Sequence, residues 1–248
     1  MFAFSLRTAI VAVFAGLAAF SSADARMLRA ARPSLRRHLV SVRDAGCYDY
    51  VLVTTRGTTE PQGPSFAFTT MVQNTLSNVP GGAQVNTEYP ALYDGMSPIL
   101  GMNALKSYLD DAVQRCPNQK IVLLGYSQGS FVSSLALQPY TDTSSPVFQA
   151  IKAIVLLGNP VHQPDFAGNV DDQGGSSTAK AWGAIYSPFT PTVPEVYKDK
   201  VKDICLLGDA VCDEKNPNPQ NVHGNYGQLQ GVQDIGTNFL RQQLQASN

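Results

Sequence analysis

From residue 47 onward, short apolar runs alternate with segments in which apolar residues recur at helical spacing. The runs at 120–125 and 151–158 are apolar at almost every position, which is typical of strands that are buried on both faces of a parallel sheet. In full, the pattern predicts strands at 48–54, 84–89, 120–125, 151–158 and 201–207, and helices at 65–79, 97–116, 130–137 and 226–245. This alternation predicts an α/β fold of the doubly wound, three-layer type, in a single domain over residues 38–248.

The first 25 residues have the features of a targeting segment. Arg7 precedes an unbroken apolar run over residues 9–20, and Ala23-Asp24-Ala25 offers the small residues that a cleavage site needs. This run is shorter than the roughly 20 residues that cross a bilayer, so an integral membrane anchor is disfavoured. We expect residues 1–25 to be a signal peptide and the protein to be secreted and extracellular.

Residues 26–37 are rich in arginine and contain no acidic residue. They end in the dibasic pair Arg36-Arg37, a sequence at which processing proteases cut. We therefore expect a basic pro-segment at 26–37 in front of the folded domain, with a disordered basic tail as the alternative.

Charge in this chain of 248 residues is sparse and nearly balanced, with 18 Lys and Arg against 19 Asp and Glu. A protein that binds nucleic acid needs a basic face to replace the counterions of the phosphates, so nucleic acid is not an expected partner. The chain has three histidines and four cysteines, which argues against a metal cluster. We expect neither a metal nor a cofactor.

Four cysteines in an exported chain indicate two disulfides, for which three pairings exist. The separation of only seven positions between Cys205 and Cys212 favours a local bridge, which leaves Cys47 to pair with Cys116. The local bridge would also hold the loop that follows the last predicted strand.

The sequence Gly125-Tyr126-Ser127-Gln128-Gly129 follows a buried strand directly and precedes a helical segment. In this context, the G-x-S-x-G motif predicts a nucleophile elbow, a strand-to-helix turn so tight that only glycine fits on either side of the serine. The serine hydroxyl then lies at the carboxyl end of the sheet, beside a helix N-terminus that favours developing negative charge. Ser127 is therefore the candidate nucleophile, and the backbone N–H of Gln128 is a candidate oxyanion donor.

A serine nucleophile needs a histidine as general base and an acid to orient that histidine. In this architecture the chain order is serine, acid, histidine, which selects His223 and leaves His162, which comes too early, as a loop histidine near the site. Asp209 follows the last predicted strand at the same sheet edge and is the preferred acid. Asp203, inside that strand, and Asp213, beyond the disulfide loop, are weaker alternatives.

At this point the chain resembles the cutinase family, which also contains acetylxylan esterases, and especially its compact polyester-hydrolysing branch. The resemblance spans nearly all of the chain from residue 47 and rests on Thr55-Arg56-Gly57-Thr58-Thr59-Glu60-Pro61, Gly125 to Gly129, Leu157-Gly158-Asn159-Pro160, Cys205 to Cys212, and His223. It implies an α/β hydrolase-type fold with a central five-stranded parallel sheet and a lidless site. It also implies the triad of Ser127, Asp209 and His223, the two disulfides above, and Thr58 as the second oxyanion donor.

The sequence says less about the substrate than about the catalytic residues. Segment 213–222, which in cutinases is apolar and helps form the acyl-binding wall, is polar here and has Val222 as its only aliphatic residue. Segment 165–194 shows no clear period and is expected to lie over the sheet; its Ile185 and Phe189 are candidate substrate-binding residues, with ordinary loop packing as an equal alternative.

We therefore expect a serine carboxylic ester hydrolase that cleaves cutin-like or synthetic polyesters and short- to medium-chain esters through a Ser-His-Asp acyl-enzyme mechanism. An acetylxylan esterase is the alternative, and a non-catalytic secreted binding protein on the same fold is a more remote one. The expected partner is the ester or polyester substrate, and the protein is expected to be a monomer.

Overall fold

The structure is a computed structural model that describes residues 46–246, so the expected signal peptide and pro-segment lie outside the described residues. Within the described range, six strands form one sheet in the order β2-β1-β3-β4-β6-β5, and every neighbouring pair is parallel. The strands are β1 (Tyr50–Thr55), β2 (Gly82–Asn86), β3 (Lys120–Tyr126), β4 (Ile151–Leu157), β5 (Asn169–Val170) and β6 (Val201–Ile204).

The expected count of five strands is wrong, because β5 adds a sixth at one edge of the sheet. This strand has only two residues, which pair with Asp203 and Ile204 of β6. It lies inside the long segment 165–194, and two residues are too few to produce a period in the sequence.

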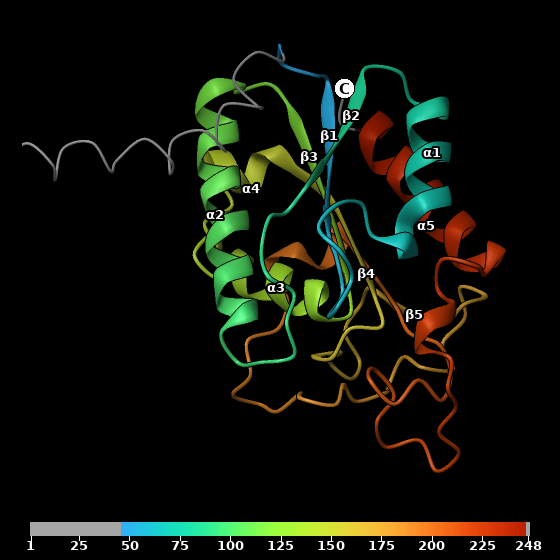
Figure 1. Cartoon of the computed structure of the whole chain (residues 1–248). Coiled ribbons are helices and arrows are strands. Elements are labelled where there is room, and N and C mark those ends of the chain that lie inside the picture. The colour runs from blue at the N-terminus through green and yellow to red at the C-terminus, as the bar shows by residue number, and fades with distance from the viewer. Residues whose placement is uncertain (1–45, 247–248) are drawn as a thin grey trace, which may run out of the picture. The chain divides into compact units, whose positions relative to one another are not determined.

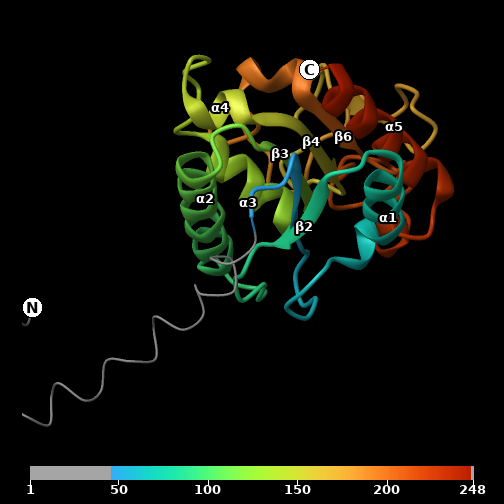
Figure 2. The same ribbon diagram turned by 90° about the horizontal axis from the view of Figure 1, so that it is seen from above.

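Helices cover both faces of the sheet (Figures 1 and 2). Side chains of β1 show the division, since Val51 and Val53 pack into the core on one face while Tyr50 and Leu52 pack into the core on the other. The first core includes residues of α2 (Ser97–Arg115), α3 (Gln128–Leu137) and α4 (Pro146–Ala150), and the second includes residues of α1 (Thr69–Asn78) and α5 (Gln230–Ala246). The predicted three-layer, doubly wound α/β fold is therefore confirmed.

Three short 3-10 helices of the described residues modify the predicted elements. The predicted helix at 65–79 consists of η3 (Phe66–Phe68) followed by α1, and η4 (Glu195–Lys200) precedes β6. The closing helix begins at Gln230 rather than at residue 226, because η5 (His223–Asn225) and a further turn come before it.

Two disulfides form with the expected pairing. Cys47 is joined to Cys116, which links the chain just before β1 to the end of α2. Cys205 is joined to Cys212 in the loop that follows β6. The second bridge encloses Asp209, so the loop carrying this residue is fixed at both ends.

The carboxyl ends of the parallel strands share one edge of the sheet, at the lower end in Figure 1. Loops and the single turn η5 surround this edge, and none of the longer described helices forms a lid across it. In open α/β sheets, ligands bind outside this edge. No helix within residues 46–246 has both the length and the apolar character needed to cross a membrane.

Candidate active site

Ser127 lies in a strained turn between β3 and α3. Its φ of 52° and ψ of −119° place it in a backbone conformation that residues other than glycine rarely adopt. A Cβ on Gly125 would lie 2.7 Å from the carbonyl oxygen of Gly129, and a Cβ on Gly129 would clash with the carbonyl of Thr55. Both glycines of the predicted elbow are therefore required by close backbone packing.

The turn is held by hydrogen bonds to the neighbouring strand β4 and to β3, the strand that precedes it. The N–H of Ser127 donates to the carbonyl of Leu157 in β4 at 2.9 Å. The Ser130 hydroxyl donates to the carbonyl of Gly125 at 2.7 Å. These bonds keep the Ser127 hydroxyl at the carboxyl edge of the sheet.

The structure brings the three predicted triad side chains together from distant parts of the chain. Nε2 of His223 lies 2.9 Å from Oγ of Ser127, and Nδ1 of His223 lies 2.9 Å from Oδ2 of Asp209. An ionised carboxylate can only accept hydrogen bonds, so Nδ1 carries the proton and Nε2 is free to accept the serine proton. This geometry permits proton transfer from serine to imidazole.

The Asp209 carboxylate is completely buried, whereas the His223 side chain is 26% exposed. Besides His223, the N–H of Val211 donates to Oδ1 at 2.9 Å and the hydroxyl of Tyr226 donates to Oδ2 at 2.7 Å. Sequence reasoning did not identify Tyr226, which carries no motif of its own.

Tyr126 and Gly158 both restrict the position of the His223 imidazole. The ring of Tyr126 stacks on it with centroids 5.2 Å apart, and the Tyr126 hydroxyl donates to the carbonyl of His223 at 2.8 Å. Gly158 has a φ of +55°, and a Cβ there would lie 2.7 Å from Cε1 of His223. A larger residue at position 158 would therefore displace the imidazole from the serine.

The two predicted oxyanion donors are the N–H groups of Thr58 and Gln128. They directly follow Gly57 and Ser127, which lie side by side at the nucleophile elbow. A Cβ on Gly57 would lie 3.2 Å from Cβ of Ser127, so the loop after β1 runs directly beside the serine and places Thr58 there. Among the described residues, the N–H groups of Thr58 and Gln128 have no acceptor. Both N–H groups are thus available to a ligand, and their role stays a prediction.

The loop that carries Thr58 is held by two charged side chains that were part of the recognised motif but had no assigned role. One oxygen of Glu60 accepts from the N–H of Gly57 at 2.5 Å, and the other accepts from the N–H of Phe66 at 2.9 Å. The buried guanidinium of Arg56 donates to the carbonyls of Glu60 and Tyr89. These contacts fix the backbone conformation of the loop that carries Thr58.

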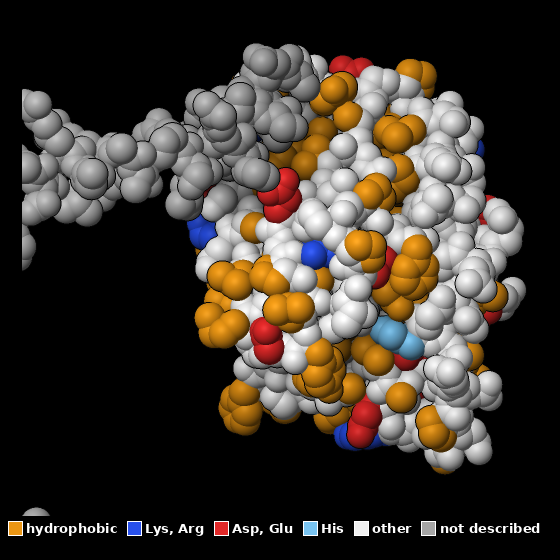
Figure 3. Space-filling view, viewed as in Figure 1, with side chains coloured by type: hydrophobic (Ala, Val, Ile, Leu, Met, Phe, Trp, Pro, Cys, Tyr) orange, Lys and Arg blue, Asp and Glu red, His pale blue; other side chains and the backbone are white. Residues whose placement is uncertain are grey.

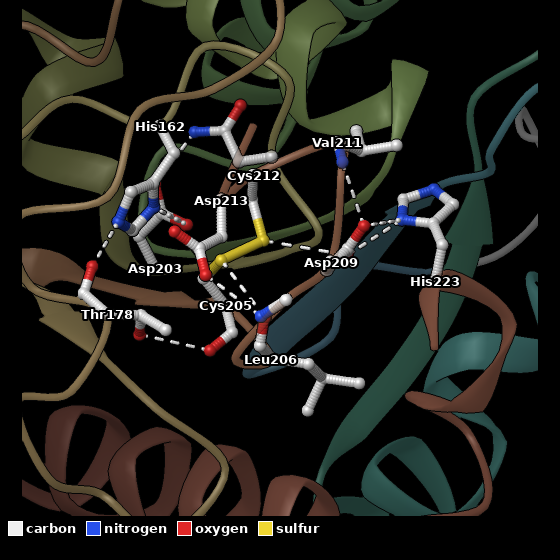
Figure 4. The surroundings of a disulfide bond; sticks show 12 residues. His162, Thr178, Asp203, Cys205, Leu206, Asp209, Val211, Cys212, Asp213 and His223 are labelled. Carbon is white, nitrogen blue, oxygen red and sulfur yellow. Dashed lines mark hydrogen bonds and ion pairs between the residues drawn. A yellow bond between two sulfur atoms is a disulfide. The ribbon is translucent and has the colours of Figure 1, made fainter. Parts of the chain in front are cut away.

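His162 is not part of the triad geometry and forms a second, buried histidine–aspartate pair. Its Nδ1 lies 3.0 Å from Oδ1 of Asp203, which defines an ion pair rather than a well-aligned hydrogen bond. Burial lowers the pKa of His162, but the Asp203 carboxylate and the Thr178 carbonyl more than offset this, so its pKa is raised. Figure 4 shows this pair and the Asp209–His223 pair on opposite sides of the disulfide.

The two weaker acid candidates have structural partners instead. Asp203 also accepts from the side-chain amide of Asn159 at 2.7 Å. Asp213 accepts from the N–H of Gly208 at 2.8 Å and from Asn216 at 2.6 Å. Neither carboxylate is among the recorded hydrogen-bond or ion-pair partners of His223.

The three candidate substrate-binding residues differ in their surroundings. Val222 is half-buried against the core beneath α1 and α5, Ile185 is 48% exposed, and Phe189 is 96% exposed. Their role in substrate binding stays a prediction.

A larger group of exposed apolar side chains lies in the loop before α2 and in its first turn. We call it the apolar surface; its members are Leu92, Tyr93, Met96, Ile99 and Leu100. Figure 3 shows hydrophobic side chains gathered over this end of α2. The side chain of Gln128 donates to the carbonyl of Leu92 at 2.9 Å, so the apolar surface adjoins the residue that follows Ser127.

The described residues contain no group of three or more His, Cys, Asp or Glu side chains that could hold a metal ion.

Comparison with known proteins places these features in one family. A family model described as Cutinase matches residues 46–244. The chain is similar to Cutinase 11 of Verticillium dahliae, with 31% identity over 203 residues, 73% of this chain and 65% of that protein. The match therefore spans slightly less than two thirds of that relative.

Two further similarities extend this result. Acetylxylan esterase 2 of Talaromyces purpureogenus is 28% identical over 195 residues, which cover 71% of this chain and 78% of that protein. A solved structure of a cutinase-like protein from Cryptococcus sp. matches with a TM-score of 0.75 and 35% identity, covering 81% of this chain and 97% of that one.

Proposed function

Because this chain belongs to the cutinase family, we propose that it is a secreted serine carboxylic ester hydrolase that cleaves cutin-like or synthetic polyesters together with short- and medium-chain esters. The observation that carries the proposal is the hydrogen-bonded series from Ser127 through His223 to the buried Asp209. Two disulfides support secretion, since such bonds persist in oxidising compartments.

In the proposed acylation step, Oγ of Ser127 attacks the ester carbonyl carbon while Nε2 of His223 takes the serine proton. The carbonyl oxygen becomes an oxyanion, and the N–H groups of Thr58 and Gln128 donate hydrogen bonds to it. Each such donor lowers the barrier of acyl transfer by roughly 3 kcal/mol. The C–O bond then breaks, and protonated His223 gives its proton to the leaving alcohol.

Deacylation repeats these roles with water as the nucleophile. His223 takes a proton from water as it attacks the acyl-enzyme, and the same two N–H groups stabilise the second oxyanion. Collapse of this intermediate returns the proton to Ser127 and releases the acid. Asp209 remains ionised throughout and holds the imidazole in the required tautomer.

The apolar surface favours a polyester over acetylated xylan. It exposes aromatic and aliphatic side chains next to Gln128, with Tyr93 94% and Met96 63% exposed. A polyester chain can cover such a surface and remove it from water, whereas a hydrated sugar polymer offers little apolar area in return.

Ester chain length separates the two family activities. On a series of p-nitrophenyl esters from acetate to octanoate, we expect hydrolysis of butyrate and hexanoate at rates at least as high as acetate, together with release of soluble acid from an aliphatic polyester. Activity confined to acetate, with release of acetate from acetylated xylan, would identify an acetylxylan esterase instead.

Replacing Tyr93 and Met96 by serine is expected to lower the initial rate on a polyester film roughly fivefold more than the rate on soluble p-nitrophenyl butyrate, because less apolar area is buried on the film. The matched control is Val196→Ser, which removes an exposed apolar side chain from η4, at the amino end of β6. Equal losses on both substrates, or the same loss in the control, would count against the apolar surface as the polymer contact.

A further inference from the structure

Asp209 presents an unusual electrostatic problem. Its carboxylate is fully buried, and among residues 46–246 no lysine or arginine is recorded as its ion-pair partner. An ionised carboxylate in such a place is stable only if hydrogen-bond donors replace the lost water. The donors available here are the imidazole of His223, the N–H of Val211 and the hydroxyl of Tyr226.

The hydroxyl of Tyr226 is held in one orientation. It lies 2.7 Å from Oδ2 of Asp209, and it accepts a hydrogen bond from the N–H of Leu206 at 3.1 Å. Because the Leu206 donor occupies the phenol oxygen, the phenol hydrogen is directed at the carboxylate. Leu206 follows β6 by two residues, so the bond extends from the end of the sheet to the acid.

The phenol ring itself is fixed by its surroundings. Tyr226 is completely buried, and its ring meets the His223 ring edge to face with centroids 6.1 Å apart. The side chain of Gln233 in α5 donates to the carbonyl of Tyr226 at 2.8 Å. Tyr226 therefore contacts both triad partners from a rigid position.

We propose that Tyr226 is a positioning residue of the triad: its hydroxyl fixes Oδ2 of Asp209 in line with Nδ1 of His223 and shares the negative charge of the carboxylate. The inference rests on the proposed triad of Ser127, His223 and Asp209. Tyr226 touches no reacting atom and acts through Asp209.

The hydroxyl remains a donor across the pH range in which an esterase works. Burial, and then the neighbouring Asp209 charge, raise the pKa of Tyr226 well above its ordinary value. Other titratable groups around the carboxylate are His223 of η5, Tyr126 at the end of β3, Asp203 on β6 and Asp213 in the same loop.

Loss of this donor has two effects with the same sign. A carboxylate with one donor fewer has a less dispersed negative charge and attracts the proton of the imidazolium more strongly. It is also less stable as an anion. Since both changes protonate the site at higher pH, the acid side of the activity profile must move upward.

Tyr226→Phe removes one oxygen and keeps the ring. We expect kcat/KM for p-nitrophenyl butyrate at pH 8 to fall about tenfold, through kcat with KM little changed. The acid side of the kcat/KM profile is expected to move up by about one pH unit, which is the scale of one hydrogen bond to a charged group.

Tyr197→Phe is the matched control. Tyr197 is also completely buried, and its hydroxyl donates to the carbonyl of Tyr140 at 2.7 Å, on the opposite face of the sheet. This variant is expected to lose stability but to keep the wild-type pH profile. A Tyr226→Phe enzyme with the wild-type profile, or with a loss that Tyr197→Phe reproduces, would overturn the inference.

A second measurement covers a Tyr226→Phe protein that fails to fold. Site-specific 3-fluorotyrosine at position 226 keeps the hydroxyl and makes it a stronger donor, so the acid side should move to lower pH; an unchanged profile counts against the inference. Failure of the proposed function is recognised separately, because the wild-type enzyme would then neither hydrolyse esters nor react with an organophosphonate.

Discussion

Ser127→Ala is expected to lower kcat/KM for p-nitrophenyl butyrate by about 10⁵- to 10⁶-fold, the scale of nucleophile removal in other serine hydrolases. The change removes only Oγ, so His223 loses the group 2.9 Å from its Nε2 and no acyl-enzyme can form. Fold stability should change little, because the N–H of residue 127 still bonds to Leu157. Initial rates and thermal unfolding of the purified variant measure both quantities.

A phosphonate label tests the same assignment independently. Mass spectrometry of the wild-type enzyme after treatment with an organophosphonate should find one adduct, on Ser127, and none on the Ser127→Ala variant. Ser144→Ala, which changes an exposed serine in the loop before α4, serves as the control and should be labelled like wild type. If Ser127→Ala kept more than a hundredth of the wild-type activity, the assignment of Ser127 as the nucleophile would be wrong.

The features that the sequence predicts well depend on neighbouring residues. The elbow follows from five consecutive residues with a strand before and a helix after, and the close contacts of Gly125 and Gly129 give the physical reason. The buried strands follow from uninterrupted apolar runs, and the Cys205–Cys212 bridge from a short spacing. Each of these signals is local, so no knowledge of the fold is required to read it.

The features that the sequence leaves out depend on contacts between distant segments. Gly158 is constrained by the ring of His223, and the role of Tyr226 depends on Leu206 and Asp209. A tyrosine or glycine in a loop has no period that could indicate such a partner. The fold creates these contacts when it brings the loops after β4 and β6 and the turn η5 to one sheet edge.

His162 illustrates the same limit for charged residues. Chain order excluded it as the general base but gave no reason for its burial. In the structure it pairs with Asp203, which looked in the sequence like an alternative acid. The two residues pair with each other, so one contact accounts for the burial of His162 and for the role of Asp203.

Asp209→Asn is expected to lower kcat for p-nitrophenyl butyrate roughly 10⁴-fold with a small change in KM. Three donors converge on the carboxylate, whereas an amide offers one oxygen. If that oxygen keeps the bond to Val211, the amide NH₂ replaces Oδ2 and faces Nδ1 of His223. The NH₂ then donates to Nδ1 and moves the imidazole proton to Nε2, which can no longer accept the proton of Ser127.

Asp213→Asn is the matched control, because it makes the same change of charge four residues further along the chain, directly after the Cys205–Cys212 bridge. Its oxygen can still accept from the N–H of Gly208, since both recorded bonds of Asp213 use the single atom Oδ2. We expect this variant to keep kcat within about tenfold of wild type, because no tautomer of His223 depends on it. A loss in Asp213→Asn as large as that in Asp209→Asn would mean that negative charge in the loop, rather than orientation of the imidazole, supports catalysis.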